Sequence, residues 1–322
     1  MKAIFRGLAL ACATLACASA AMAAYPEKPI TLIVHFPPGS STDVIARTLA
    51  MEAGKDLGQS IIIENKPGAD GAIAAQEVKR SQPDGYTLLI ATNSPMSGVP
   101  VMRKQSPYDP VKDFSPITDI GRYSFFLYTR AEVPGNTLKE FIQHVKQNPG
   151  KLSYGSGNVT GLLSFAYVAE ASNLDILNVP YKGEPPVIND MLGGHLHAAV
   201  ATSGTGMPQV KAGKFKALAT VLPERSPNAP DVPTMAEAGL NGFPIAPWLG
   251  LFGPAGMPAD VVDRLNAAFK TAMDKPAVKQ TMQAQDFMLT PSTPAALGQL
   301  VKDQLESHRK LLRATGLEGS QN

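Results

Sequence analysis

Four clusters of small polar residues follow apolar, strand-like runs in this chain, and their hydroxyl and amide groups suit the binding of an anion. The first lies in the stretch FPPGSST and the third in YGSGNVTG. Each would supply neutral hydrogen-bond donors at the point where a strand ends. The clusters comprise Phe36, Pro38, Gly39, Ser40, Ser41 and Thr42; Thr92, Asn93 and Ser94; Ser156, Gly157, Asn158 and Thr160; and Thr202, Ser203 and Thr205.

The first cluster precedes a helical pattern, and a helix N-terminus carries partial positive charge and free N–H groups. Gly39 would let a ligand approach the backbone closely, so an anion could bind there without an arginine. The simpler interpretation is that Ser41 or Thr42 caps the helix and Asp43 complements its dipole. The third cluster repeats this device, and all four clusters fall at the carboxyl ends of predicted strands, where ligands bind in open α/β sheets. We therefore predict a cleft that is lined by neutral donors and binds a small carboxylate.

A catalytic serine and a metal site are the main competing interpretations. Ser156 and Ser203 lie in glycine-containing turns, but neither completes the G-x-S-x-G pattern of a hydrolase nucleophile, so no catalytic residue is predicted. His195 and His197 would share one face of a strand, but two histidines alone make a poor metal site, so no metal and no cofactor are expected. Trp248 is either a buried aromatic packed at a lobe crossing or a wall that stacks on an aromatic ligand.

The N-terminus has the pattern of a secretory signal peptide over residues 1–23. Lys2 and Arg6 precede an apolar run, and Ala21 and Ala23 are small residues of the kind that a signal peptidase reads. An uncleaved membrane anchor is the alternative, but the run is shorter than the ~20 residues that span a bilayer. We therefore expect a periplasmic protein.

Charge and cysteine usage exclude several classes of protein. Both cysteines, Cys12 and Cys17, lie in the predicted signal peptide, so the exported chain would have no disulfide and no thiol nucleophile. Two of the 29 Lys and Arg residues are lost with that segment, which leaves 27 against 27 Asp and Glu residues. A neutral chain lacks the basic surface that nucleic acids require, so no nucleic-acid partner is expected.

Strand-like and helical runs alternate along the chain, which predicts an α/β fold with mostly parallel sheets flanked by helices. Residues 30–36 have the pattern of a buried strand, and residues 41–58 have that of a helix ending at a glycine. Two long amphipathic helices are expected near the C-terminus, over residues 258–275 and 294–316.

Two apolar stretches, residues 121–130 and 242–254, are candidate crossings between lobes. Two crossings imply that the first lobe is discontinuous and that the second is inserted into it. We expect residues 24–124 and 244–322 to form lobe 1 and residues 125–243 to form lobe 2, with a cleft between them.

A series of longer motifs covers essentially the whole exported chain. In order, they are YPEKPITLIVHFPPGSSTDVIAR, ENKPGADGAIAAQEV, PDGYTLL, VPYKGEPPVINDMLGGHL, APDVPTMAEAGLNGF and WLGLFGPAGMP. In these motifs the chain resembles the periplasmic solute-binding proteins of tripartite tricarboxylate transporters, also called the Bug family. The resemblance implies a two-lobe, type II-like periplasmic binding protein fold that closes on one small organic acid.

The resemblance also implies how the acid is held: by backbone N–H groups, hydroxyls and bridging waters, without an ion pair. Carried over to this sequence, the first loop corresponds to residues 36–42 and the anion loop of the second lobe to residues 156–160. The loop formed by Ala201, Thr202 and Ser203 is expected to face the ligand from the inserted lobe.

The chain departs from the family pattern at three positions. Proline is common at the position of His35, a second glycine at that of Ser40, and an acid near Ala201. Without that acid, a ligand with an ammonium group loses its obvious partner. The departures therefore favour di- or tricarboxylates or aromatic acids over amino acids.

We predict an exported solute-binding protein that captures a small organic acid, a di- or tricarboxylate or an aromatic carboxylate. It would deliver this acid to the membrane subunits of a tripartite transporter and act as a monomer. The alternative is an exported ligand sensor that presents the bound acid to a signalling receptor, since both functions use the same closed shape. An exported hydrolase is less well supported, because no nucleophile motif is complete.

Overall fold

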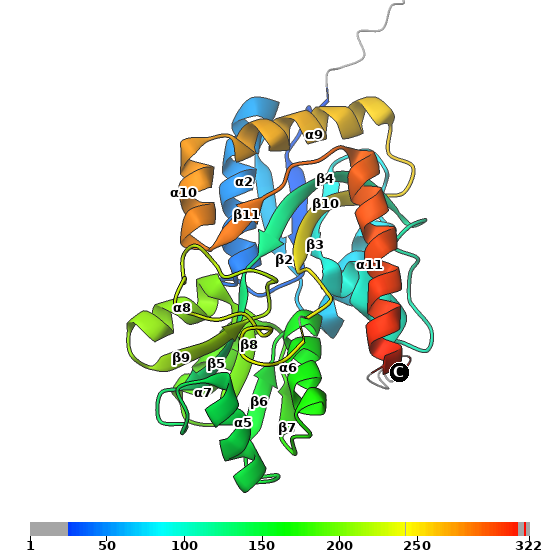
Figure 1. Ribbon diagram of the computed structural model, residues 1–322. Helices are drawn as coiled ribbons and strands as arrows, with labels where there is room; N and C mark the ends of the chain where they lie inside the picture. Colours follow the sequence, from blue (N-terminus) through cyan, green and yellow to red (C-terminus); the bar gives the residue numbers. More distant parts are fainter. Residues whose placement is uncertain (1–24, 242, 315–318, 320–322) are drawn as a thin grey trace, which may run out of the picture.

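The computed structural model describes residues 25–241, 243–314 and 319, so the predicted signal peptide lies outside the described residues. The strands of this described part form a six-stranded sheet and a five-stranded sheet, which are the upper and lower parts of Figure 1. Helices flank both sheets, and the predicted two-lobe α/β fold is confirmed.

The first sheet is mixed, with the strand order β11-β4-β10-β3-β1-β2. Its strands are β1 (Ile30–Val34), β2 (Ile61–Asn65), β3 (Thr87–Thr92), β4 (Phe114–Tyr123), β10 (Trp248–Pro254) and β11 (Phe287–Leu289). Strand β1 is parallel to β2 and β3. In contrast, β10 is antiparallel to both β3 and β4, and β11 is antiparallel to β4. The largely parallel arrangement expected from the sequence therefore holds for β2, β1 and β3.

Helices cover both faces of the first sheet. They are α2 (Ser41–Leu57), α3 (Ala72–Lys79), α4 (Val99–Met102), α9 (Ala259–Met273), α10 (Pro276–Ala284) and α11 (Pro294–Ala314), with short turns η1 (Ala69–Gly71) and η2 (Ser94–Gly98). Leu32 and Val34 of β1 pack in one apolar cluster with Ile45 of α2. Ile33, which points the other way, packs in a second cluster with Leu297 of α11. Burial on both faces explains the unbroken apolar run of this strand.

The second sheet has the order β7-β6-β8-β5-β9 and is also mixed. Its elements are β5 (Phe125–Arg130), α5 (Leu138–Gln147), β6 (Ser153–Ser156), α6 (Val159–Ala171), β7 (Leu177–Pro180), α7 (Glu184–Leu192), β8 (Ala198–Thr202), α8 (Ser203–Lys211) and β9 (Phe215–Thr220). Strand β6 is parallel to β7 and β8, whereas β5 is antiparallel to β8 and β9.

The chain passes between the two sheets at two places. A single residue, Ser124, separates β4 of the first sheet from β5 of the second, and the return lies between β9 and β10. All described strands of the first sheet fall within 24–124 and 244–322, and those of the second within 125–243. That these segments move as two lobes about the crossings stays a prediction.

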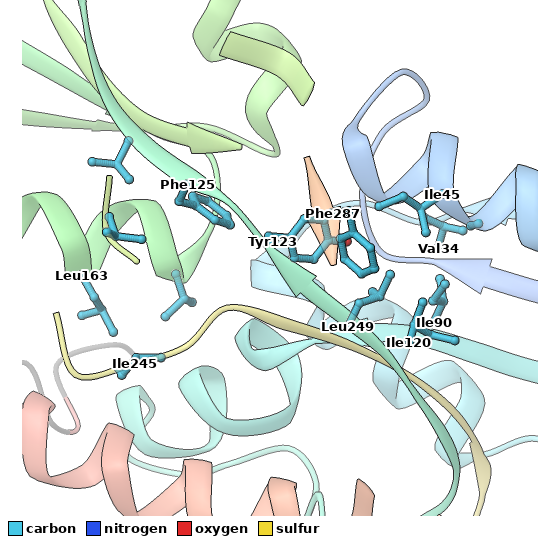
Figure 2. Close-up of a cluster of buried hydrophobic side chains, with 14 of the residues drawn as sticks. Val34, Ile45, Ile90, Ile120, Tyr123, Phe125, Leu163, Ile245, Leu249 and Phe287 are labelled. Carbon is cyan, nitrogen blue, oxygen red and sulfur yellow. The ribbon is translucent and has the colours of Figure 1, made fainter. Parts of the chain in front are cut away.

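Aromatic side chains pack around the first crossing. The ring centroids of Tyr123 and Phe287 are 4.8 Å apart, and those of Tyr123 and Phe125 are 6.1 Å apart. Figure 2 shows Tyr123 beside Phe287 and Phe125 on the side of Leu163, within one apolar cluster. This cluster includes residues of both sheets, so an apolar core continues through the crossing.

The described helices include none that combines the length and the apolar character needed to cross a membrane.

Candidate ligand-binding site

A cavity lies between the two sheets, where strands of both end and helices of both begin. Its empty volume, which includes space open to solvent, is about 340 Å³. Most of its lining is contributed by hydroxyl and amide side chains. The lining residues are Phe36, Ser40, Ser41, Thr42, Thr92, Asn93, Ser94, Tyr123, Phe125, Asn158, Thr160, Glu184 and Thr202.

Four helices start at this cavity. Ser40 is the N-cap of α2 and accepts a hydrogen bond from Asp43 N. Asn158 is the N-cap of α6 and accepts from Gly161 N. Helix α7 begins with Glu184, and α8 follows Thr202 directly. The partial positive ends of four helices therefore lie around one small polar space, which favours an anion.

Hydrogen bonds cross the cavity from one sheet to the other. Asn93 Nδ2 donates to Thr160 Oγ1 at 2.9 Å, and Val159 N donates to Ser94 Oγ at 3.3 Å. The hydroxyl oxygens of Ser41 and Thr202 lie 3.0 Å apart. These contacts join loops from opposite sides of the cleft, so the structure represents a closed arrangement.

In the first loop, Ser40, Ser41 and Thr42 all line the cavity, and one of them also caps a helix. Ser40 caps α2, whereas the sequence left Ser41 or Thr42 as the candidate caps. Burial alone would raise the pKa of Asp43, but hydrogen bonds from Arg47, Asn65 and Gly39 lower the pKa below its usual value. Asp43 therefore stabilises the turn as an anion, and the cavity-facing side chains here are neutral.

Tyr123 and Phe125 line the cavity from the crossing between the sheets and were not predicted as site residues. The phenol oxygen of Tyr123 is 2.7 Å from Thr42 Oγ1. Burial raises the pKa of Tyr123 far above its usual value, so the phenol stays neutral. The only signal in the sequence was the position of both residues in the predicted crossing, 121–130.

Glu184 corrects the prediction of a lining without charged side chains. Its carboxyl group is buried and lines the cavity at the start of α7. Asn158 Nδ2 donates to Oε1 at 2.9 Å, and the hydroxyls of Thr202 and Thr205 lie 2.6 and 2.7 Å from Oε2. Burial raises the pKa of Glu184, and these hydrogen bonds only partly oppose the rise. The residue was visible in the motif VPYKGE, but nothing in the sequence indicated that it reaches the cavity.

Two predicted residues of the second-lobe loop, Ser156 and Gly157, lie beside the cavity instead of in it. They line an adjoining, larger space of about 800 Å³ that shares Phe36 and Asn158 with the first. Ser156 Oγ donates to Asn178 Oδ1 at 2.9 Å. His35 also lines this second space, and burial lowers the pKa of His35 to about 3, so its ring is neutral.

The remaining predicted residues lie outside both spaces. Pro38 and Gly39 are exposed in the turn before α2, and Gly39 N donates to Asp43. Ala201 is buried in a core cluster opposite Phe126 because side chains alternate along β8. Ser203 N donates to Ser124 O. Trp248 is fully buried against Phe252, which agrees with the packing interpretation and not with a ligand-stacking wall.

His197 has a structural contact, since Ser153 N donates to its Nδ1 at 3.1 Å. In the described part of the chain, no three His, Cys, Asp or Glu side chains are grouped as metal ligands would be.

Two β-sheets that are flanked by helices and joined by two crossings, with a polar cavity between them, define the periplasmic binding protein fold. Residues 45–317 match the TctC family, whose description is tripartite tricarboxylate transporter family receptor. The chain belongs to this family, as its motifs indicated.

Related sequences span almost the whole chain. It is 36% identical over 320 residues to the UPF0065 protein in the gbd 5'region of Cupriavidus necator, with 97% of each chain covered. It is 32% identical over 296 residues to Protein BugT of Bordetella pertussis, with 91% of this chain and 90% of BugT covered.

Solved structures share the fold over about nine tenths of the chain. The periplasmic binding protein BugD superposes with a TM-score of 0.88 at 33% identity and covers 91% of this chain and 99% of its own. MatC from Rhodopseudomonas palustris, with bound malate, has a TM-score of 0.85 at 30% identity, covering 89% and 100%. A further R. palustris protein, with adipate, has a TM-score of 0.87 at 28% identity, covering 91% and 98%. One of these structures is of a periplasmic binding protein, and the other two hold a dicarboxylate.

Proposed function

We propose that this protein is an exported solute-binding protein that captures a small dicarboxylate in the cavity between its lobes. One observation carries the proposal: four helix N-termini and a ring of hydroxyl and amide side chains surround one space, and none of the described residues that line it is Arg or Lys. Such a site selects for an anion by oriented dipoles and hydrogen bonds.

The strength of such a site suits reversible capture. A hydrogen bond to a charged acceptor contributes roughly 1.5–3 kcal/mol net. Several of them, after the cost of association, supply the ~8 kcal/mol of a micromolar complex. Malate and adipate, bound by two structural relatives, are both dicarboxylates, which supports this ligand class over aromatic acids.

The family description supports delivery of the ligand to a membrane transporter. In this proposal the signal peptide directs the chain to the periplasm, where the protein acts as a monomer and performs no chemistry on the acid. Closure around the ligand excludes water from the cavity and strengthens the hydrogen bonds inside it. Opening at the transporter reverses that gain and releases the acid.

A thermal-shift screen tests the ligand class. Malate, succinate and adipate are compared with citrate, benzoate and glutamate, each at the same concentration. A ligand at 100 times its Kd stabilises the folded state by about 2.7 kcal/mol, so a dicarboxylate should raise the Tm by several degrees. If none of the acids shifts the Tm, or glutamate gives the largest shift, the proposed ligand class is wrong.

Co-purification from cells separates delivery to a transporter from a sensor role. Tagged protein that is cross-linked with its acid present should retain tripartite transporter subunits. Retention of a sensor kinase in their place would contradict the transport proposal.

A further inference from the structure

Glu184 is a buried carboxyl group inside a cavity that suits an anion, and nothing in the proposed function explains it. Its burial is almost complete, with 5% of the residue exposed. An ionised Glu184 would repel a bound carboxylate, and charges interact more strongly at a buried site than in water. The protonation of Glu184 therefore bears directly on ligand affinity.

The number of protons available to one series of hydrogen bonds indicates whether the Glu184 carboxyl group is protonated. Ser41 Oγ donates to Gln285 Oε1 at 2.7 Å, so its proton is used. The contact between Ser41 and Thr202, 3.0 Å across the cleft, then needs the proton of Thr202. Yet Thr202 Oγ1 also lies 2.6 Å from Glu184 Oε2, a distance at which two oxygens require a proton between them.

With the Gln285 amide oriented as it is, every contact in this series of hydrogen bonds has a proton only if Glu184 is protonated. Glu184 then donates to Thr202, Thr202 donates across the cleft to Ser41, and Ser41 donates to Gln285. Thr205 donates to the same carboxyl oxygen of Glu184 at 2.7 Å. When Glu184 is ionised, Thr202 gives its proton to the carboxylate, and the pair that joins the lobes has no proton left.

In the described part of the chain, no Lys or Arg side chain forms an ion pair with the Glu184 carboxyl. The pKa of its carboxyl is raised by burial, and only hydrogen bonds from Thr202, Thr205 and Asn158 act against that. Tyr123 of β4 and Tyr128 of β5 interact electrostatically with Glu184. Two elements that contact α7 also carry titratable groups, which are Tyr154 of β6 and Lys211 in the last turn of α8. Helix α7 itself carries Asp190, and Lys182, just before it, is exposed.

We propose that Glu184 carries a proton in the closed, loaded protein, so that capture of a dicarboxylate is accompanied by uptake of one proton. This inference rests on the proposed function. In the open form Glu184 is a carboxylate, and closure converts it to a carboxylic acid with a proton taken from solvent. Affinity therefore rises as the pH falls, and Glu184 sets the pH range in which the protein binds.

Isothermal titration calorimetry tests this with the wild-type chain, using malate and adipate as probes. Titrations in phosphate and in Tris, at about pH 7, give the number of protons taken up, expected to be close to one. Both probes are fully ionised above about pH 6. Over the range of about pH 6 to 8, the Kd should weaken by up to about tenfold per pH unit, the limit for one linked proton.

Two variants locate the proton. Glu184→Gln keeps the shape without the charge, so its Kd should vary by less than about twofold over this range, with no proton uptake. Glu52→Gln is the matched control, because Glu52 is buried on α2, away from the cavity, and pairs with Lys55. It should keep the wild-type pH dependence.

The outcomes are distinguishable. Binding that is independent of pH, without proton uptake, overturns the inference and leaves the proposed function intact; it would mean that the Gln285 amide is turned and that Glu184 is ionised. Proton uptake that persists in Glu184→Gln also overturns it. If neither probe binds at any pH, the proposed function fails, and the inference fails with it.

Discussion

At the scale of residues, the cavity is lined mostly by hydroxyl and amide side chains, and none of the described residues that line it carries a positive charge. Ser41 and Thr202, like Asn93 and Thr160, reach across the cleft toward each other. In the proposed function Asn93 and Thr160 change partners when a carboxylate enters, whereas the contact between Ser41 and Thr202 persists. The Thr160 hydroxyl should then contribute to affinity more than to the stability of the fold.

Replacing Thr160 by valine removes one such hydroxyl and keeps the side-chain shape. Loss of one hydrogen bond to a charged acceptor, roughly 1.5–3 kcal/mol, should weaken the Kd for a dicarboxylate by about ten- to a hundredfold. Thr48→Val is the control, since Thr48 bonds only to Val44 O within α2. Calorimetric titration of both variants checks this, and equal affinities for the two would contradict the site.

A buried histidine outside the site should make stability depend on pH. Burial lowers the pKa of His308 to about 4, against about 6.5 in an unfolded chain. Below pH 6.5 the unfolded chain binds a proton that the folded chain refuses, so this contribution to stability falls as the pH drops toward 4. Between pH 7 and pH 5 the loss is about 2 kcal/mol.

Urea unfolding of the wild type and of His308→Leu at both pH values measures this effect. The difference in unfolding free energy between the two proteins should shift by about 2 kcal/mol in favour of the variant at the lower pH. A difference that is the same at pH 7 and pH 5 would show that His308 is not responsible.

The sequence predicted which residue types line the cavity better than which individual side chains do. The clusters of small polar residues can be recognised in the sequence because each directly follows an apolar, strand-like run. Glu184 and Ala201 were interpreted poorly for one reason: which of two neighbouring residues faces a cavity depends on the pleat and on loop geometry, which the residue types do not encode.

At the scale of elements, the site depends on loops that pack closely against each other. The T-x-x-E pattern of Thr137 and Glu140 is typical of a helix start, and the two residues form a capping box at the start of α5. The same pattern at Thr234 and Glu237 forms the reciprocal bonds, but only turns follow. Helix α10 and strand β11 were not predicted, because both are short and their positions depend on packing against α2 and β4.

A glycine in the β6–α6 loop should be essential because it touches another backbone. A Cβ at Gly157 would lie 2.6 Å from the carbonyl carbon and oxygen of Gly183 and 2.7 Å from Glu184 N. Since backbone atoms cannot turn away, Gly157→Ala should push the two loops apart. It should cost about 1–3 kcal/mol of stability and weaken dicarboxylate binding.

Gly298→Ala is the control for a glycine without such a contact. Gly298 lies in α11, and a Cβ there would meet only Pro116 Cγ of β4, at 3.5 Å. It should leave binding unchanged and stabilise the helix by about 0.5–1 kcal/mol. Denaturant titration and calorimetry compare the two variants, and wild-type binding by Gly157→Ala would refute the role of the loop contact.

At the scale of the whole molecule, the two sheets share one apolar core at the crossing, and each sheet is flanked by its own helices. The alternation of strands and helices was enough to predict an α/β fold, and the two apolar crossings and the family motifs indicated its two lobes. The antiparallel directions of β5 and β10 were not predicted, because strand direction follows from where the chain crosses between sheets and not from periodicity. The lobe boundaries and the ligand contacts remain predictions.

A crystal structure of the protein with bound malate or adipate tests the central claim most directly. If the dicarboxylate binds as proposed, one of its carboxylates should lie between the lobes, within hydrogen-bonding distance of Ser41, Thr160 or the N-termini of α2 and α6. A ligand bound elsewhere, or held mainly by an arginine or a metal ion, would contradict it.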